Sequence, residues 1–201
     1  MSHKSTLFNA FNILISFVQL HTLHKPCFMH TIGPMLKGQD LLVAMKLAAN
    51  VGAPWTFATL GGALGMSPSE ARYALQRAAK SELVSIRTRS SILPSLLEFL
   101  IHGVRYAFPA EHGHRVRGVP TADSAVPLSE HLAANLDGQM VWRYAEGTTR
   151  GESVSPIYES VPVAAMQDQK LYRLLALLDG IRVGGPRVRA LAQDLLAKEL
   201  R

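Results

Sequence analysis

Six polar side chains between residues 69 and 80 have the types and spacing that contact with DNA requires. Arginine and glutamine form paired hydrogen bonds with guanine and adenine edges in the major groove, and lysine neutralises phosphates. At 3.6 residues per turn, the six side chains share one side of a helix. The predicted DNA-contacting face consists of Ser69, Arg72, Tyr73, Gln76, Arg77 and Lys80.

The helix that carries this face is predicted over residues 68–81. Ser67 is a favourable N-cap, Pro68 suits the first helical position, and Glu70 stands where a capping box requires it. Ser67 is also an expected DNA contact, because it opens the same helix. The opposite side is a stripe of small apolar residues that allows close packing on a partner helix: Ala71, Ala74, Leu75 and Ala78.

A shorter helix is predicted just upstream, over residues 57–64. Thr56 is its expected N-cap, and Gly65 follows where a left-handed residue commonly ends a helix. Two helices joined by a glycine turn have the spacing of a helix-turn-helix motif. The alternative is a pair of ordinary bundle helices, but the exposed polar face favours DNA binding.

A half-buried strand is predicted after the second helix, because Val84, Ile86 and Thr88 alternate with polar residues. Arg87 and Arg89 lie near its far end, where they are expected to contact phosphates. A strand that carries arginines and directly follows the second helix of the motif is typical of a wing.

Residues 35–91 resemble the winged helix-turn-helix domain of MarR-like bacterial transcription regulators. The resemblance rests on a helix at 40–50, the entry at 55–60, the turn at 65–67 and the helix at 70–80. It implies that the second helix enters the major groove of double-stranded DNA and that the wing lies near the minor groove.

Composition agrees with an anionic partner. The chain has 201 residues and a net charge of +6, and seven basic residues against three acidic ones give +4 between residues 35 and 91.

Its one cysteine, Cys27, excludes an internal disulfide and fits a cytoplasmic protein. The apolar run at 7–20 is shorter than the ~20 residues of a spanning helix, so no membrane association is expected.

Residues 1–34 differ from the rest and are interpreted as an extension that does not belong to the natural protein, with Met35 as the natural start. Two sets of residues have side chains that could bind a metal, but no metal or other cofactor is predicted. The first set lies in the extension, which is better explained as a polar tail than as a metal site. The second set lies in a glycine-flanked loop, which does not hold its side chains in place for a metal. The residues are His21, His24, Cys27 and His30, and Glu111, His112 and His114.

The chain beyond the motif is predicted to be less regular. A helix is expected over 92–108, closing a DNA-binding domain at 35–108. The remainder, 109–201, is expected to be loop-rich to about 162, with two Arg-Gly turns at 115–118 and 148–151 and a strand over 140–144. Two amphipathic helices follow, at 168–178 and 186–200, joined by a turn at 179–185. The predicted fold class is mainly α, of the α+β type.

No nucleophile elbow, kinase motif, phosphate loop or paired-carboxylate motif is present in the sequence, so no enzyme is predicted. The leading hypothesis is a sequence-specific transcription regulator. The alternative is an antitoxin-like or adaptor protein whose C-terminal region binds another protein. The apolar faces of the last two helices either pack on the fold or serve that partner, and a homodimer is left open.

Overall fold

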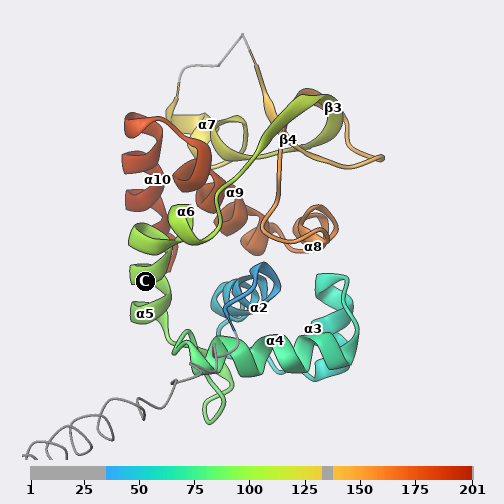
Figure 1. The fold of residues 1–201 in the computed structure, drawn as a ribbon, viewed down its shortest axis with the longest axis vertical. Coiled ribbons are helices and arrows are strands. Elements are labelled where there is room, and N and C mark those ends of the chain that lie inside the picture. The colour runs from blue at the N-terminus through green and yellow to red at the C-terminus, as the bar shows by residue number, and fades with distance from the viewer. Residues whose placement is uncertain (1–34, 133–137, 201) are drawn as a thin grey trace, which may run out of the picture. The chain divides into compact units, whose positions relative to one another are not determined.

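The helix α2 (Gly38–Ala49) lies at the centre of an α+β fold (Figure 1). The computed structural model describes residues 35–132 and 138–200, so the predictions made for residues 1–34 lie outside it. Residues Leu41 to Met45 are at most 1% exposed, since α3 (Phe57–Leu64) and α4 (Pro68–Lys80) pack on one part of α2 and α9 (Gln169–Val183) on another. These contacts cross the predicted domain boundary at residue 108.

The two predicted helices of the motif are confirmed as α3 (Phe57–Leu64) and α4 (Pro68–Lys80). Gly65 between them has φ +65° and ψ +33°, the left-handed conformation that glycine adopts without steric cost. Gly61 is also required, because a Cβ there would lie 2.7 Å from the carbonyl oxygen of Met66. The turn therefore packs directly against the backbone of α3.

A short antiparallel hairpin follows α4, with strands β1 (Val84–Ser85) and β2 (Ser90–Ser91). The half-buried strand predicted from Val84, Ile86 and Thr88 ends at Ser85, because the chain turns at residues 86–89 and leaves Ile86 58% exposed. Arg89 takes a positive φ of 54° and completes the turn without a glycine.

The predicted helix over 92–108 is confirmed with a widened turn at its middle. It consists of α5 (Leu93–Glu98), a π-helical turn (Phe99–Gly103) and α6 (Val104–Ala107). Leu96, Leu100 and Val104 are fully buried. This helix joins the part that contains α4 to the rest of the fold.

Three strands pair with one another beyond residue 111: β3 (His112–Pro120), β4 (Met140–Arg143) and β5 (Thr149–Val154). β3 is antiparallel to both others, and β4 and β5 are parallel. The strand at β4 was predicted, but β3 and β5 were missed. The two predicted Arg-Gly turns are wrong, since Arg117 and Arg150 face each other within the β3–β5 pair.

The remaining helices are α7 (Leu128–His131), α8 (Val161–Gln167), α9 (Gln169–Val183) and α10 (Pro186–Glu199), with a 3-10 turn at Ala122–Ser124. The helices α9 and α10 were predicted, but α9 runs through the expected turn to Val183. Leu171, Leu175 and Leu178 are at most 1% exposed, so the apolar face of α9 lies in the core of the chain itself.

A buried polar cluster explains why α9 continues past Asp179. Its carboxylate accepts hydrogen bonds from the Thr121 hydroxyl at 2.9 Å, the Trp142 indole at 2.6 Å and the Arg182 guanidinium at 2.6 Å. Arg182 also donates to the carbonyl oxygens of Phe108 and Ser155. Burial raises the pKa of Asp179, and the three donors oppose that rise. The cluster ties α9 to β4, the end of β5 and the end of α6.

Candidate nucleic-acid interface

Five of the six side chains predicted on the α4 face are exposed. The opposite stripe, from Ala71 to Ala78, is at most 4% exposed and packs on α2 and α3. Burial of that stripe orients the polar side of α4 outward, and Tyr73 is 59% exposed. The exposed members are Ser69, Arg72, Tyr73, Gln76 and Lys80.

Arg77 does not belong with them, which corrects its expected place. Its Nε lies 2.9 Å from Oδ2 of Asp40 and its terminal nitrogen 2.7 Å from Oδ1, in a bidentate ion pair with a fully buried carboxylate. Oδ2 also accepts from the backbone N–H of Lys37. Because Asp40 requires this cation, Arg77 fixes α4 to α2 and is not free to reach a base edge.

Ser67 and Glu70 form the predicted capping box. The Ser67 hydroxyl oxygen accepts from the backbone N–H of Glu70 at 3.2 Å, and the Glu70 carboxylate accepts from the N–H of Ser67 at 2.8 Å. These hydrogen bonds, with the backbone one dominant, lower the pKa of Glu70. Both groups lie at the solvent-exposed start of α4.

The two arginines of the hairpin lie in different surroundings. Arg87 is exposed, and within the described ranges it makes no side-chain hydrogen bond or ion pair. The Arg89 guanidinium lies 4.2 Å from the centre of the Trp55 ring and donates to the Trp55 carbonyl oxygen at 2.6 Å. The Trp55 indole donates back to the carbonyl oxygen of Arg89 at 3.1 Å. Arg89 therefore holds the hairpin against the start of α3.

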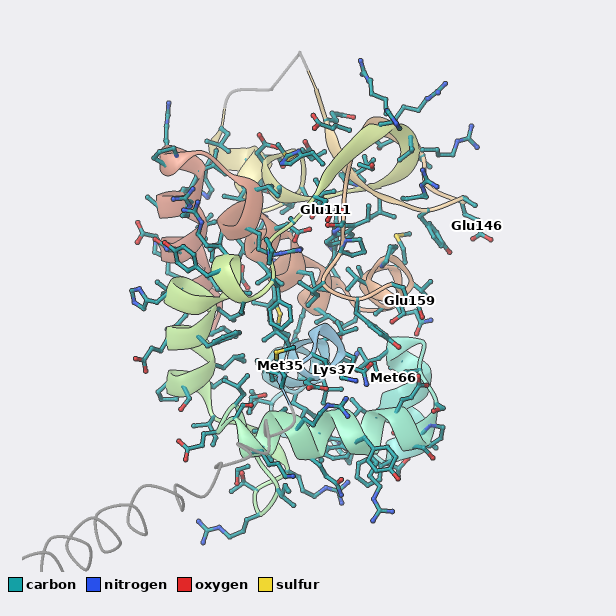
Figure 2. All side chains as sticks on the ribbon, in the orientation of Figure 1. Met35, Lys37, Met66, Glu111, Glu146 and Glu159 are labelled. Carbon is teal, nitrogen blue, oxygen red and sulfur yellow. The ribbon has the colours of Figure 1, made fainter. Side chains whose placement is uncertain are left out.

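The hairpin and α4 lie at the same end of the described unit. In Figure 1 the chain between α4 and α5 projects beyond α4 at the lower edge, and β1 packs on α4. Figure 2 shows several nitrogen-tipped side chains extending outward from this edge. Arg72, Lys80 and Arg87 are exposed there, beside the acidic residues Glu70 and Glu82.

Two residues that shape this surface were missed from the sequence. Asp40 lies 37 positions before Arg77, and Trp55 lies 34 before Arg89. Trp55 also makes an edge-to-face contact with Phe57, at 5.6 Å between ring centres. Neither ion pairing nor stacking over such separations has a local sequence pattern.

Among the described residues, Glu111, His112 and His114 are not part of a cluster that could hold a metal ion. His112 pairs with Glu152 through Nδ1 and Oε1 at 2.9 Å. Within 35–132 and 138–200, no group of three His, Cys, Asp or Glu side chains lies close enough to hold a metal ion. No helix in that part of the chain is long and apolar enough to cross a membrane.

Comparison with known proteins adds no relative: the chain matches no protein-family model, no curated protein and no solved structure at a significant level.

Proposed function

We propose that this chain is a sequence-specific DNA-binding regulator of transcription, in which α4 enters the major groove and the β1–β2 hairpin is a short wing. The observation that carries the proposal is the division of α4 into two sides. One side is buried on α2 and α3, whereas the other presents polar side chains to solvent beside a hairpin with an exposed arginine. The spacing of the two helices and the glycine turn, on which the sequence resemblance to MarR-like regulators rests, supports the same mode.

The proposed contacts follow from side-chain chemistry. Arg72 and Gln76 lie one turn apart on the exposed side of α4 and are assigned to base edges. Tyr73 and Ser69 complete the groove-facing surface, and Ser67 contacts the backbone at the helix N-terminus. Lys80 and Arg87 are assigned to phosphates, because they lie toward the far end of α4 and on the hairpin. Arg77 and Arg89 act indirectly, by holding α4 and the hairpin in place.

A capped helix with a firm support is well suited to this task. Contact with base edges discriminates between sequences only if the helix cannot shift in the groove. The Asp40–Arg77 pair fixes the last turn of α4, and the Ser67–Glu70 capping box fixes its start. The groove-facing residues lie between and beside these two fixed points.

Selection of bound duplexes from a random library tests the proposal. The purified chain is expected to enrich a common sequence, and a variant with Arg72→Ala and Gln76→Ala is expected to enrich none. The same variant should unfold like the parent chain, since both side chains are exposed. Failure of the parent chain to enrich any sequence would contradict the proposal and favour the alternative of a protein-binding adaptor.

A further inference from the structure

We propose that the outer face of the β3–β5 pair is a second, sequence-independent surface for the phosphate backbone of double-stranded DNA. Arg117 and Arg150 are directly opposite each other on adjacent antiparallel strands. Directly opposed residues of such a pair point to the same face of the sheet. Arg115, two residues before Arg117, shares that face.

Among the described residues, the arginines of this face have no carboxylate partner. Arg115 is opposite Glu152, but the Glu152 carboxylate lies 2.9 Å from Nδ1 of His112. Across the part of the chain that the structure describes, no carboxylate oxygen lies within 4.0 Å of the three guanidinium groups. All three arginines are exposed. Like charges placed directly opposite each other destabilise a strand pair, and an anion bound between them relieves that repulsion.

The backbone beside Arg117 and Arg150 packs closely against residues 139–142. A Cβ on Gly118 would lie 1.9 Å from the Trp142 carbonyl oxygen, and one on Gly151 would lie 2.1 Å from that of Gln139. Each glycine directly follows one of the two arginines, and each permits the close approach of β4. The two guanidinium groups therefore project from a closely packed three-strand support.

Phosphate is the anion that this arrangement fits. A guanidinium presents several N–H donors in one plane and binds a phosphate through two of them. Arg115 and Arg117 are separated by roughly 7 Å along β3. Arg150 is beside Arg117 on the neighbouring strand, so the three arginines form a cluster that can contact more than one phosphate of an extended backbone.

This face is distinct from the α4 surface. In Figure 1, β3 lies at the end of the described unit opposite α4, and Figure 2 shows nitrogen-tipped side chains extending outward beside β3. One straight duplex docked on α4 would not reach it. The second surface would therefore contact another duplex segment, without reading its sequence.

The test compares two triple variants of equal net charge. The face variant carries Arg115→Gln, Arg117→Gln and Arg150→Gln, and the control carries Arg143→Gln, Arg187→Gln and Lys198→Gln. Arg143 is opposite Gly118 and so belongs to the other face of the same sheet, whereas Arg187 and Lys198 are exposed on α10. Both sets are built in the parent chain and in a chain with Arg72→Ala and Gln76→Ala, and melting curves check folding.

Binding of a random-sequence 30-base-pair duplex is measured by fluorescence anisotropy at several salt concentrations. The face variant is expected to lose about tenfold or more in affinity, with the salt slope reduced by roughly 0.9 for each phosphate that the face no longer neutralises. The control should lose clearly less. Equal losses in the two variants, or no loss in either, would overturn the proposal. The proposal would also be overturned if polyglutamate bound as tightly as the duplex and lost affinity to the same extent in the face variant. That result would assign the face to an acidic protein.

The α4 substitutions separate this inference from the proposed function. If the α4 substitutions leave the affinity for random duplex unchanged, and adding the face substitutions removes that binding, the second surface is independent of α4. If the α4 substitutions alone abolish binding to random duplex, no second surface exists. If the α4 substitutions change the affinity for neither the selected duplex nor the random duplex, and the face substitutions lower both affinities, the proposed role of α4 is wrong. The proposal for the β3–β5 surface is then supported.

Discussion

Arg72 and Arg77 differ in role although both lie on the polar side of α4. Arg72 is exposed, whereas the guanidinium of Arg77 is bound to a carboxylate that is itself 0% exposed. A buried ion pair contributes little net stability compared with apolar residues of the same size, but removing one partner is costly. The pair therefore fixes the position of α4 more than it adds free energy.

Arg77→Ala should reduce the free energy of unfolding by about 3–5 kcal/mol, because it leaves the Asp40 carboxylate buried without its cation. Urea unfolding monitored by circular dichroism measures this. Arg72→Ala is the matched control on the same helix and should stay within about 0.5 kcal/mol of the parent chain. Equal effects of the two substitutions would show that the ion pair does not form.

Asp168 gives the stability a dependence on acid pH. Burial raises its pKa, but hydrogen bonds from Lys46, Asn50 and the N–H of Leu171, with the Lys46 charge, outweigh burial and lower it overall. A carboxyl with a lowered pKa in the folded state stabilises the fold above its unfolded pKa, about 3.9. That contribution is lost as pH falls below this value toward the folded pKa.

Asp168→Asn should therefore remove part of the acid dependence while lowering stability at neutral pH. Unfolding free energies measured between about pH 7 and pH 2 test this. Glu130→Gln, at an exposed carboxyl on α7, is the control and should change neither end of the curve. Parallel curves for Asp168→Asn and the parent chain would contradict the assignment.

The helix ends that could be predicted from the sequence are those that depend on residues close together in the chain. The start of α4 depends on Ser67, Pro68 and Glu70, which lie within four positions, and the end of α3 depends on Gly65. The strands β3 and β5 depend on pairing between residues more than 30 positions apart, and their glycines resemble turns until the close approach of β4 is known.

The same reason explains the error at the end of α9. Asp179 and Gly180 resemble a turn, yet Asp179 is satisfied by Thr121 and Trp142, which lie far away in the sequence. Gly180 lies against α7, since a Cβ there would lie 2.5 Å from Leu128. The exposure of the polar residues of α4 and of Arg87 was predictable. The structural roles of Arg77 and Arg89 were not.

The side chain of Ser67 stabilises the start of α4. Ser67→Ala should cost about 1 kcal/mol of unfolding free energy, because the Glu70 N–H loses its acceptor. Ser67→Asp, which restores an acceptor and adds negative charge at the helix start, should recover most of it. Thermal and urea unfolding of both variants measure the difference, and a stable Ser67→Ala chain would place the helix start elsewhere.

At the scale of the whole molecule, the α4 region and the C-terminal helices share one core. Asp168, the N-cap of α9, accepts hydrogen bonds from Lys46 and Asn50 of the α2 region, and the Ser160 hydroxyl donates to the Leu64 carbonyl oxygen. Arg182 reaches the end of α6. A substitution that destabilises α9 should therefore also destabilise α2.

Asp179→Asn should destabilise the chain by about 3–5 kcal/mol, because it leaves the buried Arg182 charge uncompensated. Hydrogen exchange of backbone amides is the measurement. The most protected amides of α2 and α9 should lose protection by the same amount, since they open together. Loss confined to α9, with α2 unchanged, would mean two independently folding units.

Discrimination between DNA sequences by α4 can be measured by comparing two single substitutions. Arg72→Ala and Arg87→Ala are titrated against a selected duplex and a scrambled duplex at several salt concentrations. Arg72→Ala should lose roughly 1–3 kcal/mol of discrimination at one position of the site. Arg87→Ala should weaken both duplexes alike and lower the salt slope by roughly one phosphate's worth. Identical behaviour of the two variants on both duplexes would contradict the placement of α4 in the groove.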